Sequence, residues 1–163
     1  MSDLSPCPVN DSEYIARFVF DPMHITRKRA LKPSFFDYVF DKGCSVQRDS
    51  IAPNGEVLRF IAGFVRKNPK AEWLGVVSAK CAELRSIVAP ESGHRALCVY
   101  DTAEEGNPAH AEMCSTRYIV EEADRLEVSR HLMAAFGDGV IQERASYRRG
   151  GIWTVLQTNP RWD

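Results

Sequence analysis

The fold class is decided by the middle of the chain, WLGVVSAKCAELRSIVAPESGHRALCVYD, which spans Trp73–Asp101. Three runs in this stretch are rich in β-branched and aromatic residues, and they predict strands over Trp73–Lys80, Leu84–Val88 and Arg95–Asp101. The turn at residues 91–93, Glu-Ser-Gly, separates the last two runs. Because turns this short cannot join parallel neighbours, the stretch predicts an antiparallel meander.

Two amphipathic helices are predicted on either side of this region. The first spans Asn54–Lys67, where apolar residues recur on one face at helical spacing. The second spans Asp124–Phe136 and is followed by Gly137, a residue typical of helix termini. Shorter elements are a helix over Phe35–Phe40, strands over Tyr14–Phe20, Cys44–Arg48 and Ala109–Cys114, and a closing hairpin over Ala145–Leu156. Clustered strands with separate helices predict an α+β fold, mainly an antiparallel sheet packed by two main helices.

Length and composition indicate one ordinary globular domain. The chain has 163 residues, of which 44% are hydrophobic and 26% are charged, and such a mix supports a core without disulfides or metals. Residues 1–12 are rich in proline and polar residues, so we expect a flexible arm there and a single α+β domain over residues 13–163. No internal repeat or linker divides the chain.

The sequence predicts a cytoplasmic protein that does not enter a membrane. It contains no apolar run near the roughly 18 residues that a membrane helix needs, and it has no leader pattern at its start. The five cysteines are an odd number and are scattered, which favours reduced thiols. No paired cysteines have the spacing of a zinc site, and we expect no metal and no cofactor.

One candidate site lies in the predicted strand Ala109–Cys114. Because side chains alternate along a strand, His110, Glu112 and Cys114 should share one face, as in a metal site or a nucleophile with its base. The triplet His110-Ala111-Glu112 is similar to the zinc and proton-transfer motif of the cytidine deaminases. That family also needs a downstream Pro-Cys-x-x-Cys, which this chain lacks, so we reject this resemblance.

A second candidate site combines Arg17, Ser45 and Glu112, with His110 in the same cleft. The order of arginine, serine and glutamate resembles one class of ADP-ribosyltransferases. The resemblance implies that Arg17 holds a phosphate of NAD, Ser45 supports the nicotinamide pocket and Glu112 stabilises the developing positive charge. The family's Ser-Thr-Ser is here Cys44-Ser45-Val46, and His110 stands where the family has the first of two glutamates.

Two basic segments are candidates for contacts with phosphate or nucleic acid. Cations interleaved with aromatic residues favour single-stranded nucleic acid, whereas a net charge of −1 argues against it. The segments contribute Arg27, Lys28, Arg29 and Lys32 from one part of the chain, and Arg148 and Arg149 beside Tyr147 from another.

Three functions follow as hypotheses. The near-neutral charge, the small size and the lack of a strong motif favour a binding or accessory module that acts through contacts with a protein partner. The first alternative is a small transferase or hydrolase for a nucleotide-like substrate, using Arg17, Ser45, His110 and Glu112 in one cleft. The second alternative is a nucleic-acid binder that uses the basic segments.

Overall fold

The computed structural model describes residues 8–49, 54–137 and 141–143. It contains a six-stranded sheet with the strand order β4-β5-β2-β1-β3-β6, in which every pair of neighbours is antiparallel. The strands are β1 (Tyr14–Asp21), β2 (Cys44–Arg48), β3 (Glu72–Lys80), β4 (Leu97–Asp101), β5 (His110–Ser115) and β6 (Gln142–Glu143). The helices are the 3-10 helix η1 (Pro33–Phe40) and the α-helices α1 (Asn54–Lys67), α2 (Cys81–Ser86) and α3 (Glu122–Ala135).

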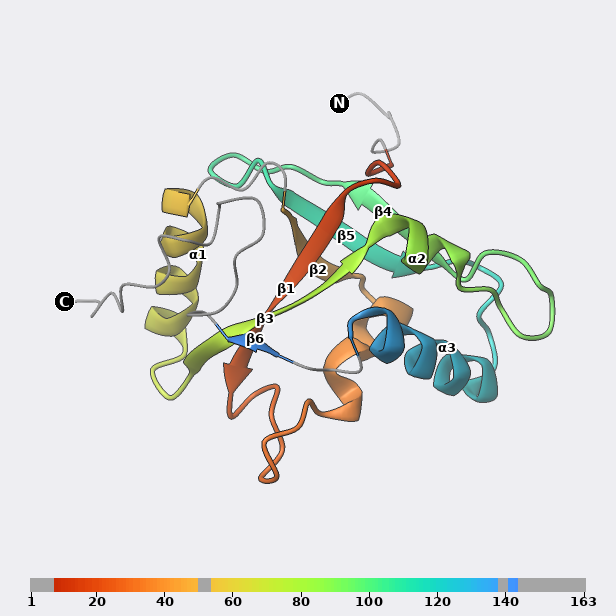
Figure 1. The fold of residues 1–163 in the computed structure, drawn as a ribbon, viewed down its shortest axis with the longest axis horizontal. Helices are drawn as coiled ribbons and strands as arrows, with labels where there is room; N and C mark the ends of the chain where they lie inside the picture. Colours follow the sequence, from red (N-terminus) through yellow and green to blue (C-terminus); the bar gives the residue numbers. More distant parts are fainter. Residues whose placement is uncertain (1–7, 50–53, 138–140, 144–163) are drawn as a thin grey trace.

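The two faces of the sheet carry separate cores. The larger core lies under η1, α2 and α3, and it includes the fully buried Phe36, Leu84 and Phe136. The smaller core lies under α1, where Ile61 packs with residues of β1 and β3. Figure 1 shows α1 on one side of β1 and β3, with α2 and α3 on the other. Alternation along each strand therefore decides which core a side chain enters.

The structure confirms the α+β class, the mainly antiparallel sheet and both main helices. Helix α1 has the predicted bounds, and α3 begins at Glu122, slightly before the predicted start. Strand β2 also has its predicted bounds. These elements were predictable because their apolar spacing matches the period of the element that forms. Within the described residues, no helix has both the length and the apolar character needed to cross a membrane.

The path of the middle of the chain differs from the predicted meander. Strand β3 lies beside β1 near the centre of the sheet, whereas β4 lies at the edge beside β5. The segment predicted as a strand over Leu84–Val88 begins inside helix α2 instead. Cys81 and Leu84 are both buried three residues apart, and Glu83 near the start and Arg85 near the end suit the helix dipole. The helix carries the chain across the larger core to the far edge.

Part of the predicted arm packs on the domain. Val9 is buried, and its backbone amide donates to the Val99 carbonyl at 3.1 Å. Arg85 binds both the Val9 carbonyl and the Asp11 carboxylate. The boundary of a flexible arm at residue 12 is therefore wrong for residues 8–12, because one buried valine and one ion pair tie them to the domain. The earlier residues of the arm and the predicted hairpin over Ala145–Leu156 lie outside the described residues.

Replacing Gly43 with alanine is expected to lower the free energy of unfolding by about 1–2 kcal/mol. Gly43 has φ +86°, and a Cβ there would collide with the Glu112 carboxylate. Gly93→Ala is a matched control, because Gly93 has φ +66° and open space around it. Urea denaturation should show a larger loss for Gly43→Ala than for Gly93→Ala. An equal loss would show that Glu112 moves aside at no cost.

Candidate anion-binding pocket

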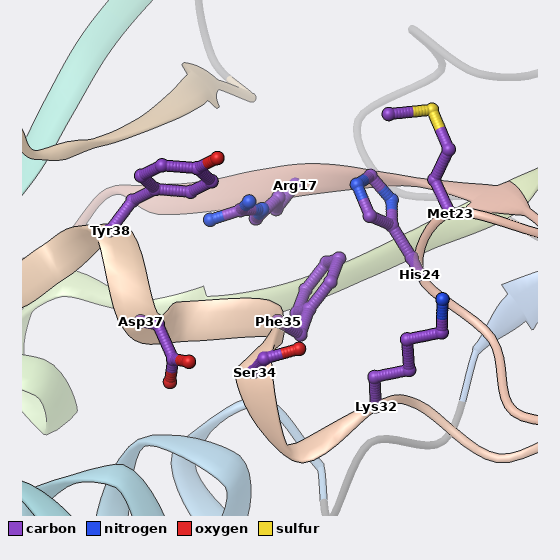
Figure 2. Close-up of a pocket in the computed structure, with 8 residues that line it drawn as sticks. All are labelled: Arg17, Met23, His24, Lys32, Ser34, Phe35, Asp37 and Tyr38. Carbon is purple, nitrogen blue, oxygen red and sulfur yellow. The ribbon is translucent and has the colours of Figure 1, made fainter.

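A pocket of about 410 Å³ opens between β1, the loop 22–32 and η1. Its walls combine cations, hydroxyl groups and aromatic rings from these three elements, so segments that are separate in sequence meet there (Figure 2). A volume of this size is within the range of small-ligand sites. The lining residues are Arg17, Met23, His24, Lys32, Ser34, Phe35, Asp37 and Tyr38. We call this site the Arg17 pocket.

Arg17 is the central group of the pocket. It lies in the middle of β1 opposite Val77, on the face that also carries Ile15 and Val19. Its guanidinium carbon lies 4.4 Å from the centre of the Phe35 ring, and Figure 2 shows the guanidinium between Tyr38 and His24. Strand alternation thus places a cation where an apolar residue would ordinarily enter the core.

The guanidinium of Arg17 lacks a compensating anion among the described residues. Its Nη1 atom is buried and makes no hydrogen bond within this part of the chain. Burial lowers the pKa of Arg17 to about 10, so the group still carries its charge at neutral pH. A buried charge without a partner is costly, and such groups are ordinarily paired. Arg17 is therefore a partly buried cation that lines the pocket and has an unpaired Nη1 atom among the described residues.

The loop 22–32 folds back as a small hairpin that brings His24 and Lys32 together. Ile25 and Leu31 form an antiparallel bridge and are both buried, which anchors the loop in the larger core. The Lys32 amide donates to the His24 carbonyl at 2.8 Å. The Lys32 ammonium donates to the Pro22 carbonyl at 2.9 Å and keeps two further hydrogens for a ligand.

His24 is neutral at physiological pH. The Phe20 amide donates to its Nδ1 atom at 3.1 Å, so the neutral ring carries its hydrogen on Nε2. Burial, followed by the nearby charges of Arg17 and Lys32, lowers the pKa of His24 to about 4. The positive charge of the pocket at pH 7 therefore comes from Arg17 and Lys32.

The start of η1 forms the remaining wall. Pro33 occupies the first turn, where its fixed φ suits a helix. Phe35 and Phe36 enter the core from this helix, whereas Ser34, Asp37 and Tyr38 stay on its outer face. Ser34 and Tyr38 add hydroxyl donors beside the two cations. Figure 2 shows the Asp37 carboxylate pointing away from the guanidinium of Arg17.

Lowering the pH from 7.5 to 4.5 is expected to destabilise the protein through His24. In the unfolded chain a histidine gains its proton near pH 6.5, whereas in the folded protein His24 gains it near pH 4. Between these values the unfolded state binds more protons, so stability falls as the pH falls. The full shift corresponds to about 3 kcal/mol, which solvent screening of the partly exposed ring reduces to about 1–2 kcal/mol.

Urea denaturation of the wild type and of His24→Gln across this pH range measures the effect. Carboxylates also titrate in this range, so the difference between the two proteins is the relevant quantity. The wild type should lose more stability than the variant between pH 6.5 and 4.5. Parallel curves for the two proteins would contradict a neutral His24 in the folded state.

The structure does not bring Arg17 together with the other predicted catalytic residues. Ser45 lies directly opposite Glu112, and Gln47 lies opposite His110, so Ser45, His110 and Glu112 share one face of the sheet. Arg17 points to the opposite face, toward η1. The prediction of one cleft formed by all four residues is therefore wrong, because strand alternation puts the sheet between them.

His110 and Glu112 occupy a polar part of that second face. The Nδ1 atom of His110 lies 2.8 Å from the Thr102 hydroxyl oxygen and 4.0 Å from a carboxylate oxygen of Glu104. Burial raises the pKa of Cys114 to about 11, which keeps this thiol protonated at neutral pH. Among the described residues, no three histidine, cysteine or acidic side chains are arranged to hold a metal ion.

The predicted phosphate-contact residues separate into two groups. Lys32 lines the Arg17 pocket, whereas Arg27, Lys28 and Arg29 are exposed at the tip of the loop hairpin. Arg29 forms an ion pair with Asp21 at 2.8 Å. The other predicted contacts, Arg148 and Arg149, lie outside the described residues.

Sequence reasoning missed the pocket residues His24, Ser34 and Tyr38. None of them belongs to a motif, and they meet only because the loop folds back against η1. One signal was present for Arg17, since alternation on β1 puts it on the same face as the apolar Ile15 and Val19. A lone arginine on an apolar strand face is unusual enough to suggest a function.

Comparison with known proteins identifies no relative. No family model, no curated protein and no solved structure matches this chain.

Proposed function

We propose that this protein is a binding module that holds an oxyanion, a phosphate or a carboxylate, in the Arg17 pocket. Two observations carry the proposal: Arg17 lines the pocket, and its buried Nη1 atom makes no hydrogen bond among the described residues. An arginine fork matches the geometry of both anions. A ligand oxyanion would supply the negative charge and the hydrogen-bond acceptor that the guanidinium of Arg17 lacks among the described residues.

The surroundings of Arg17 support an anion over other ligands. Lys32 adds a second positive charge, and Ser34 and Tyr38 add donors. Burial strengthens electrostatic attraction in the pocket because the local dielectric constant is lower than that of water. The proposal refines the binding-module hypothesis, since it names the chemical group by which a partner would be recognised. The protein partner and the cytoplasmic location expected from the sequence remain predictions.

Titration with inorganic phosphate, followed by the chemical shifts of backbone amides, tests the proposal. We expect weak, saturable shifts in β1, the loop 22–32 and η1, and their loss in Arg17→Met. Lys32→Met should weaken binding by about tenfold, because it removes one charge at short range. Lys28→Met, at the exposed tip of the same loop, is the matched control and should bind as the wild type does. Identical shifts in the wild type and Arg17→Met would refute the proposal.

The variants Lys32→Met and Lys28→Met also distinguish this proposal from nucleic-acid binding. If the basic loop tip binds phosphates of an oligonucleotide, Lys28→Met should weaken that binding as strongly as Lys32→Met. If the Arg17 pocket binds the anion, only Lys32→Met should have a large effect. The transferase alternative loses its proposed single cleft, since Arg17 and Glu112 lie on opposite faces of the sheet.

A further inference from the structure

A second hollow of about 370 Å³ shares one lining residue with the Arg17 pocket. Met23, which is 43% exposed, is the residue that their two lining sets share. The other lining residues come from the loop that follows β1 and from the turn that follows α1. They are Pro22, Lys67, Asn68, Pro69, Lys70 and Ala71. We call this cavity the Met23 hollow.

The Met23 hollow differs in chemistry from the Arg17 pocket. Two prolines, Met23 and Ala71 make its surface largely apolar, and the exposed Lys67 and Lys70 add positive charge. Proline rings and a flexible thioether are suited to contact with flat apolar groups. A ligand that spans both cavities would therefore place an anion at one end and an apolar group at the other.

The wall of the Met23 hollow is held in place by the end of α1. The side-chain amide of Asn68 donates to the Phe64 carbonyl at 3.0 Å, and the Ala71 amide donates to the Asn68 carbonyl at 2.8 Å. Phe64 stacks on Phe20 with the ring centres 4.1 Å apart. These contacts tie the turn after α1 to β1, so the hollow is formed before any ligand arrives.

The size of the Arg17 pocket also indicates a ligand larger than a free anion. A phosphate has five heavy atoms and, at about 30 Å³ for each water-sized group, would occupy only about 150 Å³. The pocket has about 410 Å³. Met23 lines this pocket and the Met23 hollow, and the largely apolar surface of that hollow is where an attached group would be buried.

We propose that the natural ligand carries its phosphate on an apolar, ring-bearing body, and that this body lies across Met23 in the Met23 hollow. The inference rests on the proposed function, because the phosphate is the group held by Arg17. Lys67 and Lys70 at the hollow favour a ligand with net negative charge.

Calorimetric titration with phenyl phosphate, inorganic phosphate and phenol tests the inference. Phenyl phosphate should bind at least about tenfold more tightly than inorganic phosphate, because its ring leaves water on binding. Phenol, which lacks the anion, should not bind measurably. Phosphotyrosine and adenosine monophosphate then distinguish the source of the ring, since one is a protein side chain and the other a nucleotide, and the tighter of the two identifies it.

Two substitutions of Met23 locate the ring. Met23→Ser should remove most of the advantage of phenyl phosphate over inorganic phosphate, whereas Met23→Leu should keep it. Equal affinity of the wild type for phenyl phosphate and inorganic phosphate, with both lost in Arg17→Met, would overturn the inference and leave the proposed function standing. Binding of neither compound, or binding unaffected by Arg17→Met, would overturn both.

Discussion

Arg17→Met is expected to make the protein more stable while it abolishes anion binding. A pKa lowered to about 10 means that burial disfavours the charged form of Arg17 by about 3 kcal/mol. The cation–π contact with Phe35 offsets about 1–2 kcal/mol of this cost. Methionine fills similar space without a charge, so we expect a gain of about 1–3 kcal/mol in the free energy of unfolding.

Thermal and urea denaturation of Arg17→Met measure this gain. For a domain of this size, each kcal/mol should raise Tm by about 2–4 °C. A residue kept at the expense of stability is typical of a functional site, because methionine at this position would otherwise serve the fold better. A loss of stability in Arg17→Met would instead show that Arg17 has a structural partner, and the case for a ligand would fail.

Arg48→Met is expected to lower the free energy of unfolding, whereas Arg17→Met is expected to raise it. Arg48 makes two hydrogen bonds to Glu13, at 2.8 and 2.9 Å, and an ion pair with Asp101 at 2.5 Å. The bond to Glu13 is the main reason that the pKa of Arg48 is raised. Without Arg48, two partly buried carboxylates lose their cation, so we expect the free energy of unfolding to fall by about 2–4 kcal/mol.

Urea denaturation of Arg48→Met and Arg17→Met measures both effects. The two variants are a matched pair, because each replaces an arginine with methionine and the two positions lie on adjacent strands. Arg48→Lys keeps the charge but loses the two-pronged contact with Glu13, so its loss should be intermediate. If Arg48→Met is as stable as the wild type, the ion-pair cluster of Glu13, Arg48 and Asp101 contributes nothing to folding.

The two arginines differ in what surrounds their guanidinium groups. Arg48 forms ion pairs with carboxylates of the same chain, whereas Arg17 lies beside the Phe35 ring and lines the pocket. Pre-organised charges of this kind reduce the cost of binding, because the side chain does not have to be ordered when the ligand arrives. The position of Arg17 is therefore useful to a binding protein although it is costly to the fold.

Sequence by itself determined the α+β class, helices α1 and α3, and strands such as β2, since these elements depend on local apolar spacing. It also singled out Arg17 and Lys32, although in two separate hypotheses. The predicted meander was wrong, because the segment that forms α2 has only six residues. Over so few residues, the apolar spacing of a helix is hard to distinguish from the alternation of a strand.

Only the tertiary structure decided which residues share a site. Neighbouring residues on a strand point to opposite faces of the sheet, so Arg17 enters the face of the larger core, whereas Ser45 and Glu112 lie on the other face. The sequence does not reveal how these strands pair, and therefore could not show this separation. The same arrangement joined Arg17 to His24, Lys32 and Tyr38. These residues meet because Ile25 and Leu31 bury the loop against the larger core, and long-range burial of this kind leaves no local pattern in the chain.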